Sequence, residues 1–236
     1  MTYQTYAYPG GELDLFADAK NWKKYWSDLI RPFIGRTVAE VGAGIGANSA
    51  HLSKGCASWT CIEPDAGLAA RIEQRRAAGE LEANCKVLVA RLPELSPDIT
   101  FDTILYLDVL EHIADDRNEL VEAAKRLMSD GYLIILSPAH QWLFTPFDLA
   151  VGHVRRYTAN DLQNLAPPGL RPRFFRYLDS VGMLASLGNA LLLKSASPTS
   201  FQIQIWDQFM VPVSRHFDRL LRFRLGKSIL AVWQAP

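Results

Sequence analysis

Short apolar segments alternate with helical segments through the middle of the chain, and this alternation constrains the fold more than any other feature. Aliphatic and β-branched residues are concentrated at 37–41, 59–63, 86–90, 101–107 and 131–137. Between these segments, helical periodicity covers 47–54, 66–78 and 115–129. Strands that are connected through helices run parallel, with helices packed on both faces of the sheet. The pattern therefore predicts an α/β, doubly wound fold.

The segments before and after this core indicate one domain over residues 1–236. Residues 13–34 carry apolar side chains close to a 3.6-residue period, which predicts an N-terminal helical cap within 1–36. Regularity then lapses from Pro138 to Tyr157, and a loop of this length is a candidate functional insertion. We expect a helix to follow at Thr158, with Asp161 completing its capping box.

Two further apolar segments, 172–178 and 227–233, predict the closing strands of the sheet. The stretch between them, 179–226, is expected to be a helical insertion. Net charge is uneven, because residues 171–227 carry nine basic and three acidic side chains in a chain that is neutral overall. Within 214–227, arginines alternate with large apolar residues, a pattern that suits a helix on an anionic membrane surface. A helix packed on the domain with a solvated basic face is the alternative.

Composition excludes several classes of protein. The chain has 236 residues, 49% hydrophobic and 21% charged, which is typical of a globular domain. Its 25 basic and 25 acidic residues cancel, which disfavours nucleic acid as a partner. Three cysteines without a CxxC pair predict neither disulfides nor a zinc site. No signal peptide or membrane-spanning segment is predicted, so we expect a cytoplasmic protein that binds at most peripherally to a membrane.

The strongest local motif is AEVGAGIGANS at 39–49, placed between a predicted strand and a predicted helix. Glycines let the backbone turn sharply and approach a ligand, and a helix N-terminus presents free N–H groups. Gly42, Gly44 and Ala47 also fit the dinucleotide pattern GxGxxA, with Glu63 about 20 residues on to bind ribose hydroxyls. Glycine spacing alone leaves NAD and other ribose-bearing cofactors open.

The neighbouring residues extend this motif. Glu40, Gly46, IEPD at 62–65, DTILYLDVLEHIADD at 102–116 and GYLIILSP at 131–138 occur in one order and spacing. Together they resemble the class I S-adenosylmethionine-dependent methyltransferases of small molecules. The resemblance implies a Rossmann-like seven-stranded sheet, mostly parallel with one antiparallel strand near the edge, and a cofactor-binding core at 37–138. It implies cofactor contacts at Glu40, Gly42, Ala43, Gly44, Gly46, Glu63, Pro64, Asp108 and Val109.

One segment departs from that family. Many relatives have an acidic residue after the third strand that binds the adenine amino group, whereas this chain has VLVARLPEL there. We expect Arg91 and Leu92 to contact adenine instead, through apolar and backbone interactions. Displacement at a sulfonium methyl group needs positioning and sometimes a base, so no metal is expected.

Catalytic candidates come from two segments. Glu111 and His112 follow the fourth strand, at the edge of a parallel sheet where ligands bind. His153, in the loop 139–157, is the best candidate for a general base because imidazole titrates near neutral pH. The same loop offers substrate-binding candidates, namely His140, Trp142, Asp148, Arg155, Arg156 and Tyr157. An ion pair from Asp148 to an arginine that only holds the loop is the alternative.

The sequence thus predicts methyl transfer from S-adenosyl-L-methionine, with S-adenosyl-L-homocysteine as product, to a small-molecule acceptor that is amphiphilic or anionic. An NAD-dependent oxidoreductase and a non-catalytic cofactor-binding scaffold are the competing hypotheses. The absence of an NPPY-type sequence after the fourth strand disfavours DNA bases and protein glutamine as acceptors.

Overall fold

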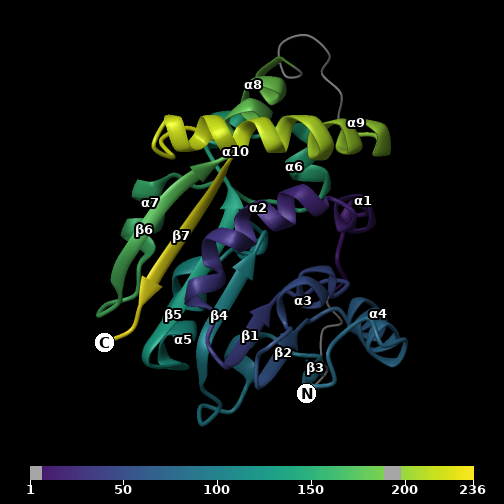
Figure 1. The fold of residues 1–236 in the computed structure, drawn as a ribbon. Coiled ribbons are helices and arrows are strands. Elements are labelled where there is room, and N and C mark those ends of the chain that lie inside the picture. Colours follow the sequence, from purple (N-terminus) through teal and green to yellow (C-terminus); the bar gives the residue numbers. More distant parts are fainter. Residues whose placement is uncertain (1–6, 189–197) are drawn as a thin grey trace.

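The computed structural model describes residues 7–188 and 198–236. Its centre is a seven-stranded sheet in the order β3-β2-β1-β4-β5-β7-β6 (Figure 1). All pairs from β3 to β5 are parallel, whereas β7 is antiparallel to both β5 and β6. The strands are β1 Thr37–Val41, β2 Ser58–Ile62, β3 Cys85–Leu88, β4 Phe101–Leu107, β5 Leu127–Pro138, β6 Arg171–Leu178 and β7 Ser228–Gln234. The predicted sheet, including its antiparallel strand near the edge, is confirmed.

Each face of the sheet has its own apolar core. Because side chains alternate along a strand, Leu105 and Ile134 pack into one core while the neighbouring Ile104 and Leu133 pack into the other. One core contains apolar residues of the N-terminal helix, and the other contains Leu120 and Leu162 from two helices on the opposite face. The helices that flank the strands are α3 Ala47–Leu52, α4 Ala66–Ala77, α5 Asp116–Lys125 and α7 Ala159–Leu165.

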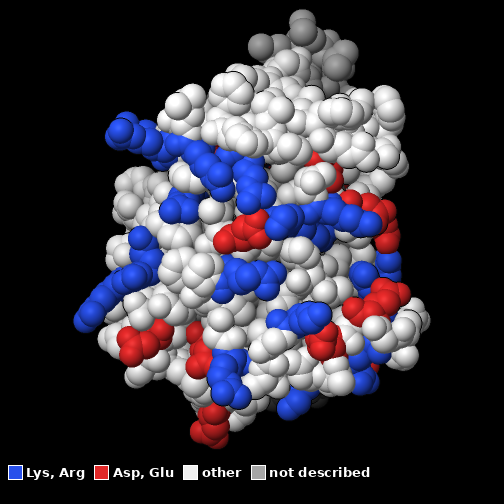
Figure 2. All heavy atoms as spheres, viewed as in Figure 1, with Lys and Arg blue, Asp and Glu red and all other residues white. Residues whose placement is uncertain are grey.

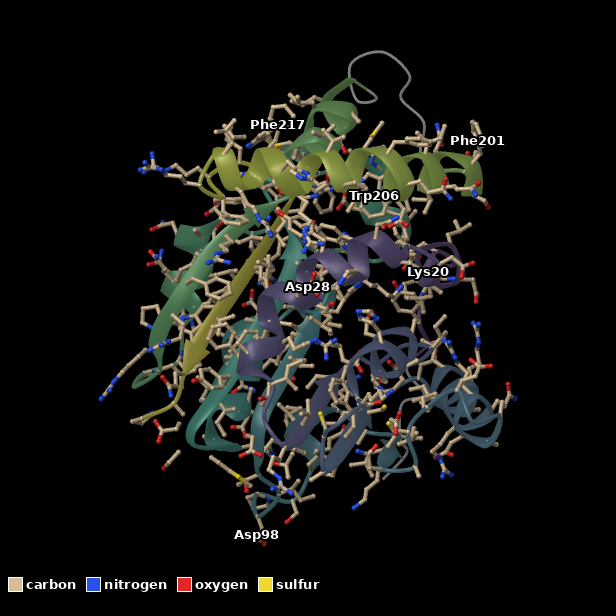
Figure 3. The ribbon with its side chains drawn as sticks, in the orientation of Figure 1. Lys20, Asp28, Asp98, Phe201, Trp206 and Phe217 are labelled. Carbon is tan, nitrogen blue, oxygen red and sulfur yellow. The ribbon has the colours of Figure 1, made fainter. Side chains whose placement is uncertain are left out.

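A helical cover lies beyond the carboxyl ends of β4 and β5 (Figure 1). It comprises α8 Ser180–Gly188, α9 Ser200–Ile205, a π-helical turn at Trp206–Met210 and α10 Val211–Leu220. The described part of the insertion 179–226 is largely helical, but the helix predicted within 214–227 ends at Leu220, because Arg222 and Phe223 have left-handed backbone. Residues 189–197 lie outside the described part. In Figure 3, Trp206 extends from this cover toward the N-terminal helix α2, Lys20–Ile30. Their indole rings, Trp22 and Trp206, lie 5.7 Å apart between centroids.

The single N-terminal helix predicted over 13–34 is wrong, because the structure divides it into α1, Leu13–Ala17, and α2. The ammonium group of Lys23 donates hydrogen bonds of 2.7 Å to the carbonyl oxygens of both Phe16 and Ala17. Lys23 thus binds the carbonyls at the end of α1, where the first helix stops.

Two other boundaries need correction. The helix predicted over 115–129 ends at Lys125, because the backbone N–H of Phe101 donates to the carbonyl of Arg126 and draws the chain into β5. The loop 139–157 is not irregular throughout, since it contains α6, Pro146–Ala150. Thr145 and Asp148 form a capping box around Pro146 at the first helical position, so the signal for this helix was present in the sequence.

Candidate active site

The glycine loop follows β1 and leads into α3. Gly42, Gly44 and Gly46 all have positive φ, at 65°, 58° and 75°, a region that side chains rarely adopt. A Cβ on Gly42 would lie 2.6 Å from the side chain of Val109, so this glycine lets the loop pack on the chain after β4. Gly44 has more space, because among the described residues only the side chain of Leu13 lies within 4 Å of such a Cβ, at 3.6 Å.

Glu63 lies at the carboxyl end of β2, next to this loop. Its carboxylate accepts hydrogen bonds from the backbone N–H groups of Gly44, at 2.8 Å, and Asp65, at 2.9 Å. Burial raises the pKa of Glu63, and the two N–H groups oppose that rise. Glu63, which is predicted to bind the ribose hydroxyls, is thus held against the glycine loop. Pro64 and Asp65 come next in the chain.

Glu40 lies beneath the loop and is fully buried. It accepts hydrogen bonds from the hydroxyl of Ser49 and from the indole N–H of Trp59, the latter at 3.1 Å. Burial raises its pKa to about 7, although these donors favour the ionised form. Glu40 therefore links β1 to α3 and β2, and Ala43 packs in the core beside it.

Asp108 follows β4 and has a left-handed backbone with φ of 57°. The residue is exposed to solvent, although protein atoms surround its carboxyl group. These surroundings raise its pKa to about 6, against the opposing effects of His153, Lys227 and Lys23. Of the predicted adenine contacts, Arg91 is exposed, whereas Leu92 is fully buried in the core.

The N-terminal segment covers this region, in keeping with the predicted N-terminal cap, although the sequence did not indicate which residues make the contacts. The backbone N–H of Tyr8 donates to Asp65 at 2.8 Å, and the Tyr8 ring packs edge-on against His112 with centroids 5.5 Å apart. Leu13 lies over Gly44. Residues that precede the first strand have no sheet register, and no periodicity marks their contacts in the sequence.

The three predicted catalytic residues converge. Glu111 and His112 belong to a short 3-10 helix, Leu110–His112, that follows β4, and His153 follows α6. One ligand-type atom from each of the three lies within 4.8 Å of the others. His153 Nε2 and Glu111 Oε1 are 3.9 Å apart, and the rings of His112 and His153 are edge to face at 4.6 Å. We call Glu111, His112 and His153 the EHH cluster.

Asp148 positions His153 from behind. Its Oδ1 lies 2.8 Å from His153 Nδ1, and it also accepts two hydrogen bonds of 2.8 Å from the guanidinium of Arg156. The hydroxyl and N–H of Thr145 bind the same carboxylate. Hydrogen bonds from His153 and Arg156 keep the pKa of Asp148 far below its usual value despite burial. Asp148 and Arg156 thus hold the loop, as the alternative to substrate binding predicted.

The other substrate candidates bind residues outside the EHH cluster. Arg155 pairs with Asp116, and the buried hydroxyl of Tyr157 donates to that same carboxylate at 2.8 Å. The ring of His140 stacks on Tyr177, with centroids 4.8 Å apart. It also stacks on Trp142, with centroids 5.4 Å apart. Arg155 and Tyr157 therefore anchor the loop to the chain after β4, and His140 and Trp142 lie toward β6.

Burial dominates the electrostatics of the EHH cluster. It raises the pKa of Glu111 well above its ordinary value, with Asp108 adding to the rise. The pKa of His112 falls to about 4, because of burial and the nearby His153 and against a hydrogen bond to the backbone of Gly152. His112 is therefore a neutral imidazole at neutral pH.

Known proteins resemble this chain in two ways. Residues 39–133 match the profile of a family described as a methyltransferase domain. No curated protein matches the chain in sequence. Among solved structures, N-methyltransferase NodS from Bradyrhizobium japonicum, in complex with S-adenosyl-L-homocysteine, has a TM-score of 0.60 at 14% identity, over 93% of this chain and 88% of its own.

A putative sarcosine dimethylglycine methyltransferase from Galdieria sulphuraria has a TM-score of 0.59 at 16% identity, over 90% of this chain and 83% of its own. A further structure, the [4+2]-cyclase SpnF, has a TM-score of 0.60 at 15% identity, over 95% of this chain and 93% of its own. Identities this low show the fold alone. Residues 39–133 of this chain therefore match the methyltransferase-domain family, and the chain as a whole shares the fold of these solved structures.

Proposed function

We propose that the chain transfers a methyl group from S-adenosyl-L-methionine to a small-molecule acceptor. The observation that carries this proposal is the meeting of three features at one edge of the sheet: the glycine loop, the Glu63 carboxylate and the accessible Asp108. All three lie inside the segment that matches the methyltransferase-domain family. NodS, which has the same fold, is described in complex with the demethylated product.

The residues fit this cofactor. The glycine loop is hydrogen-bonded to Glu63 through the N–H of Gly44, Leu13 lies in van der Waals range of Gly44, and Glu63 offers a carboxylate for two ribose hydroxyls. Asp108 would face the amino-acid end, and Arg91 would lie on the adenine side. When bound, the cofactor supplies an electrophilic methyl group on a sulfonium centre. Leu13 and Tyr8 would close over it and exclude water.

The EHH cluster supplies the acceptor side of the site in this proposal. The contact between Asp148 and Nδ1 of His153 fixes the ring, so Nε2 faces Glu111 and His112. Nε2 would accept a proton from a hydroxyl or ammonium group of the acceptor as that group is methylated.

Two measurements test this function. Calorimetric titration of the purified protein should show micromolar affinity for S-adenosyl-L-homocysteine and none for NAD. The reverse result would favour the oxidoreductase hypothesis and contradict ours. Methyl-labelled S-adenosyl-L-methionine should then label one member of a panel of phenols, amines and carboxylates. Because one structure with this fold is a cyclase, cofactor binding without transfer to any acceptor would favour the scaffold or another reaction.

A variant tests the role of His153. His153→Gln keeps a side chain of similar size but removes the imidazole, so turnover should fall about 100-fold. Affinity for S-adenosyl-L-homocysteine should stay within twofold, because His153 lies on the acceptor side. His216→Gln, an exposed histidine on α10, is the matched control and should change neither value. Equal turnover by His153→Gln would contradict the assignment.

We also propose that the helical cover contacts an anionic membrane surface, which fits an amphiphilic acceptor and a peripheral protein of the cytoplasm. Phe201, Phe217 and Leu220 are 68%, 50% and 77% exposed. Figure 3 shows Phe201 and Phe217 on the outer side of α9 and α10, and Figure 2 shows an uncharged surface there with Lys and Arg gathered beside it. No helix among the described residues is long and apolar enough to cross a membrane.

Sedimentation with vesicles tests the membrane contact. The protein should pellet with vesicles that contain phosphatidylserine, and less with neutral phosphatidylcholine vesicles or at high salt. Phe217→Ser combined with Leu220→Ser should release it, whereas Val89→Ser, which removes an exposed apolar residue far from the cover, should not. Equal sedimentation of all three proteins would contradict the proposal.

A further inference from the structure

The EHH cluster has the composition of a metal site. Two imidazoles and one carboxylate offer a ligand atom each within 4.8 Å of the others, and His153 Nε2 lies 3.9 Å from Glu111 Oε1. Ligand atoms around one tetrahedral ion are roughly 3.4 Å apart when each bond is about 2.1 Å. To share an ion, the ligand atoms would have to approach one another by about 0.5 Å for the pair at 3.9 Å and by at most about 1.4 Å for the others.

One oxygen of the cluster needs a partner. Glu111 is fully buried, and Ser137 donates to its Oε2 at 2.8 Å. Its Oε1 has no hydrogen-bond partner among the described residues and faces His153. A buried carboxylate oxygen without a partner is costly, and a cation between Glu111 and the two imidazoles would provide one.

Each candidate ligand is also oriented by a second contact. Asp148 binds Nδ1 of His153, Ser137 donates to Glu111, and the His112 ring packs edge to face against Tyr8 and His153. Histidines that bind metals usually donate their other ring N–H to a carboxylate or a backbone carbonyl.

We propose that Glu111, His112 and His153 bind one divalent first-row transition-metal ion, with Zn²⁺ as the reference ion. This departs from the sequence expectation that the protein needs no metal. The mixed nitrogen and oxygen donor set suits zinc, iron or manganese better than magnesium, which prefers oxygen. Three protein ligands leave a coordination position open, as in catalytic zinc sites.

The open position indicates the class of acceptor. A neutral or anionic oxygen, as in a phenol, an enol or a carboxylate, would bind the ion directly and lie beside the cofactor loop. In the loaded protein, His153 is a ligand, so its part as proton acceptor applies to the metal-free protein. Binding of the acceptor to the ion rests on the proposed methyltransferase function, whereas binding of the ion itself does not.

Metal binding is measured directly. The untagged full-length protein, stripped with a chelator, is titrated with Zn²⁺ by calorimetry and with Co²⁺ by visible absorption. We expect one saturable site and no competition from Mg²⁺ at equal concentration. Glu111→Gln and His153→Gln should each weaken Zn²⁺ binding at least tenfold, while His216→Gln leaves it unchanged. No saturable binding, or binding that neither cluster variant weakens, would overturn the proposal.

Titration with S-adenosyl-L-homocysteine separates the outcomes. A variant that binds it normally has kept its fold, so its loss of metal affinity belongs to the EHH cluster. If the buried Glu111→Gln does not fold, His112→Gln replaces it in the same test. Wild-type protein that binds this ligand but no metal would overturn the metal site alone. Protein that binds Zn²⁺ but not this ligand would overturn the proposed cofactor and leave the metal site.

Discussion

Buried carboxylates hold both the glycine loop and the helical cover in place. They differ in how far along the chain their hydrogen-bond partners lie. Around the loop, Glu63 and Glu40 bind Gly44 and Ser49, only 19 and 9 residues away. In the cover, Asp218 accepts from the hydroxyl of Tyr25, 193 residues away. A local arrangement leaves a motif in the sequence, whereas a distant one leaves single polar residues in apolar surroundings. The arrangement around the glycine loop can therefore be predicted from the sequence, whereas the contacts of the helical cover cannot.

If this contrast holds, a change in the loop should remove binding without loss of folding. Gly44→Val places a branched side chain at positive φ where the cofactor approaches. Affinity for S-adenosyl-L-homocysteine should fall at least about 100-fold by calorimetry, with strain on the order of 1–3 kcal/mol. Gly55→Val, also at positive φ but with nothing within 4 Å, is the control and should bind normally. Normal binding by Gly44→Val would place the site elsewhere.

A change in the cover should do the opposite. Asp218 is fully buried and accepts from the Tyr25 hydroxyl and from the N–H groups of Asp179 and Ser180. Asp218→Ala leaves these donors unpaired, so the free energy of unfolding should fall by about 3 kcal/mol in urea titrations. Tyr25→Phe should cost about 1 kcal/mol, and the exposed Arg219→Ala almost nothing. A neutral Asp218→Ala would show that the cover is not held by this carboxylate.

The pH dependence of stability sharpens the comparison within the loop region. The pKa of Glu40 is raised to about 7 in the folded protein, from 4.5, so the folded state retains a proton that the unfolded state releases. Stability from this group is therefore present at acid pH and lost as pH rises through 7.

Glu40→Gln should remove that loss and make the protein about 2 kcal/mol less sensitive to a change from pH 5 to pH 8. Urea unfolding of the cofactor-free protein at both values measures it. The exposed Glu82→Gln, which keeps the buried carboxyl, should retain the wild-type slope. An unchanged slope in Glu40→Gln would mean that this carboxyl ionises normally.

The smallest effect is expected where the two regions meet. Lys23 of α2 binds the carbonyls at the end of α1, whose Leu13 covers Gly44. Lys23→Met keeps the apolar stem but frees α1, so S-adenosyl-L-homocysteine should dissociate about threefold faster in stopped-flow measurements. Lys24→Met, its exposed neighbour, should leave the rate unchanged. A faster rate in both variants would point to charge rather than to this contact.

Most of the sheet could be predicted, because period-2 alternation and helical connections are local properties. The three residues of the EHH cluster were each named as catalytic candidates, Glu111 and His112 because they follow β4 and His153 because of its loop, but their proximity was not predicted. The break at Asp18 was missed because it depends on where the Lys23 ammonium binds. Tyr8 and Leu13 were missed for a similar reason, since their contacts depend on the folded position of a segment without register.

The substrate roles of Arg155, Arg156 and Tyr157 could not be judged from the sequence. A guanidinium in a loop has the same appearance whether it binds a ligand or an internal carboxylate. The structure pairs Arg155 with Asp116 and Arg156 with Asp148, so both charges are already used. Only three-dimensional proximity distinguishes these cases.

The carboxylate of Asp148 has a consequence for how activity would be lost. It holds Arg156 and Thr145, which fix the loop, and it also holds the ring of His153. Displacement of the loop would therefore misorient His153 in the same movement, so a loosened loop and an aligned imidazole cannot coexist. Asp148 therefore couples the two: His153 is oriented for the acceptor only when the loop around Asp148 is folded in place.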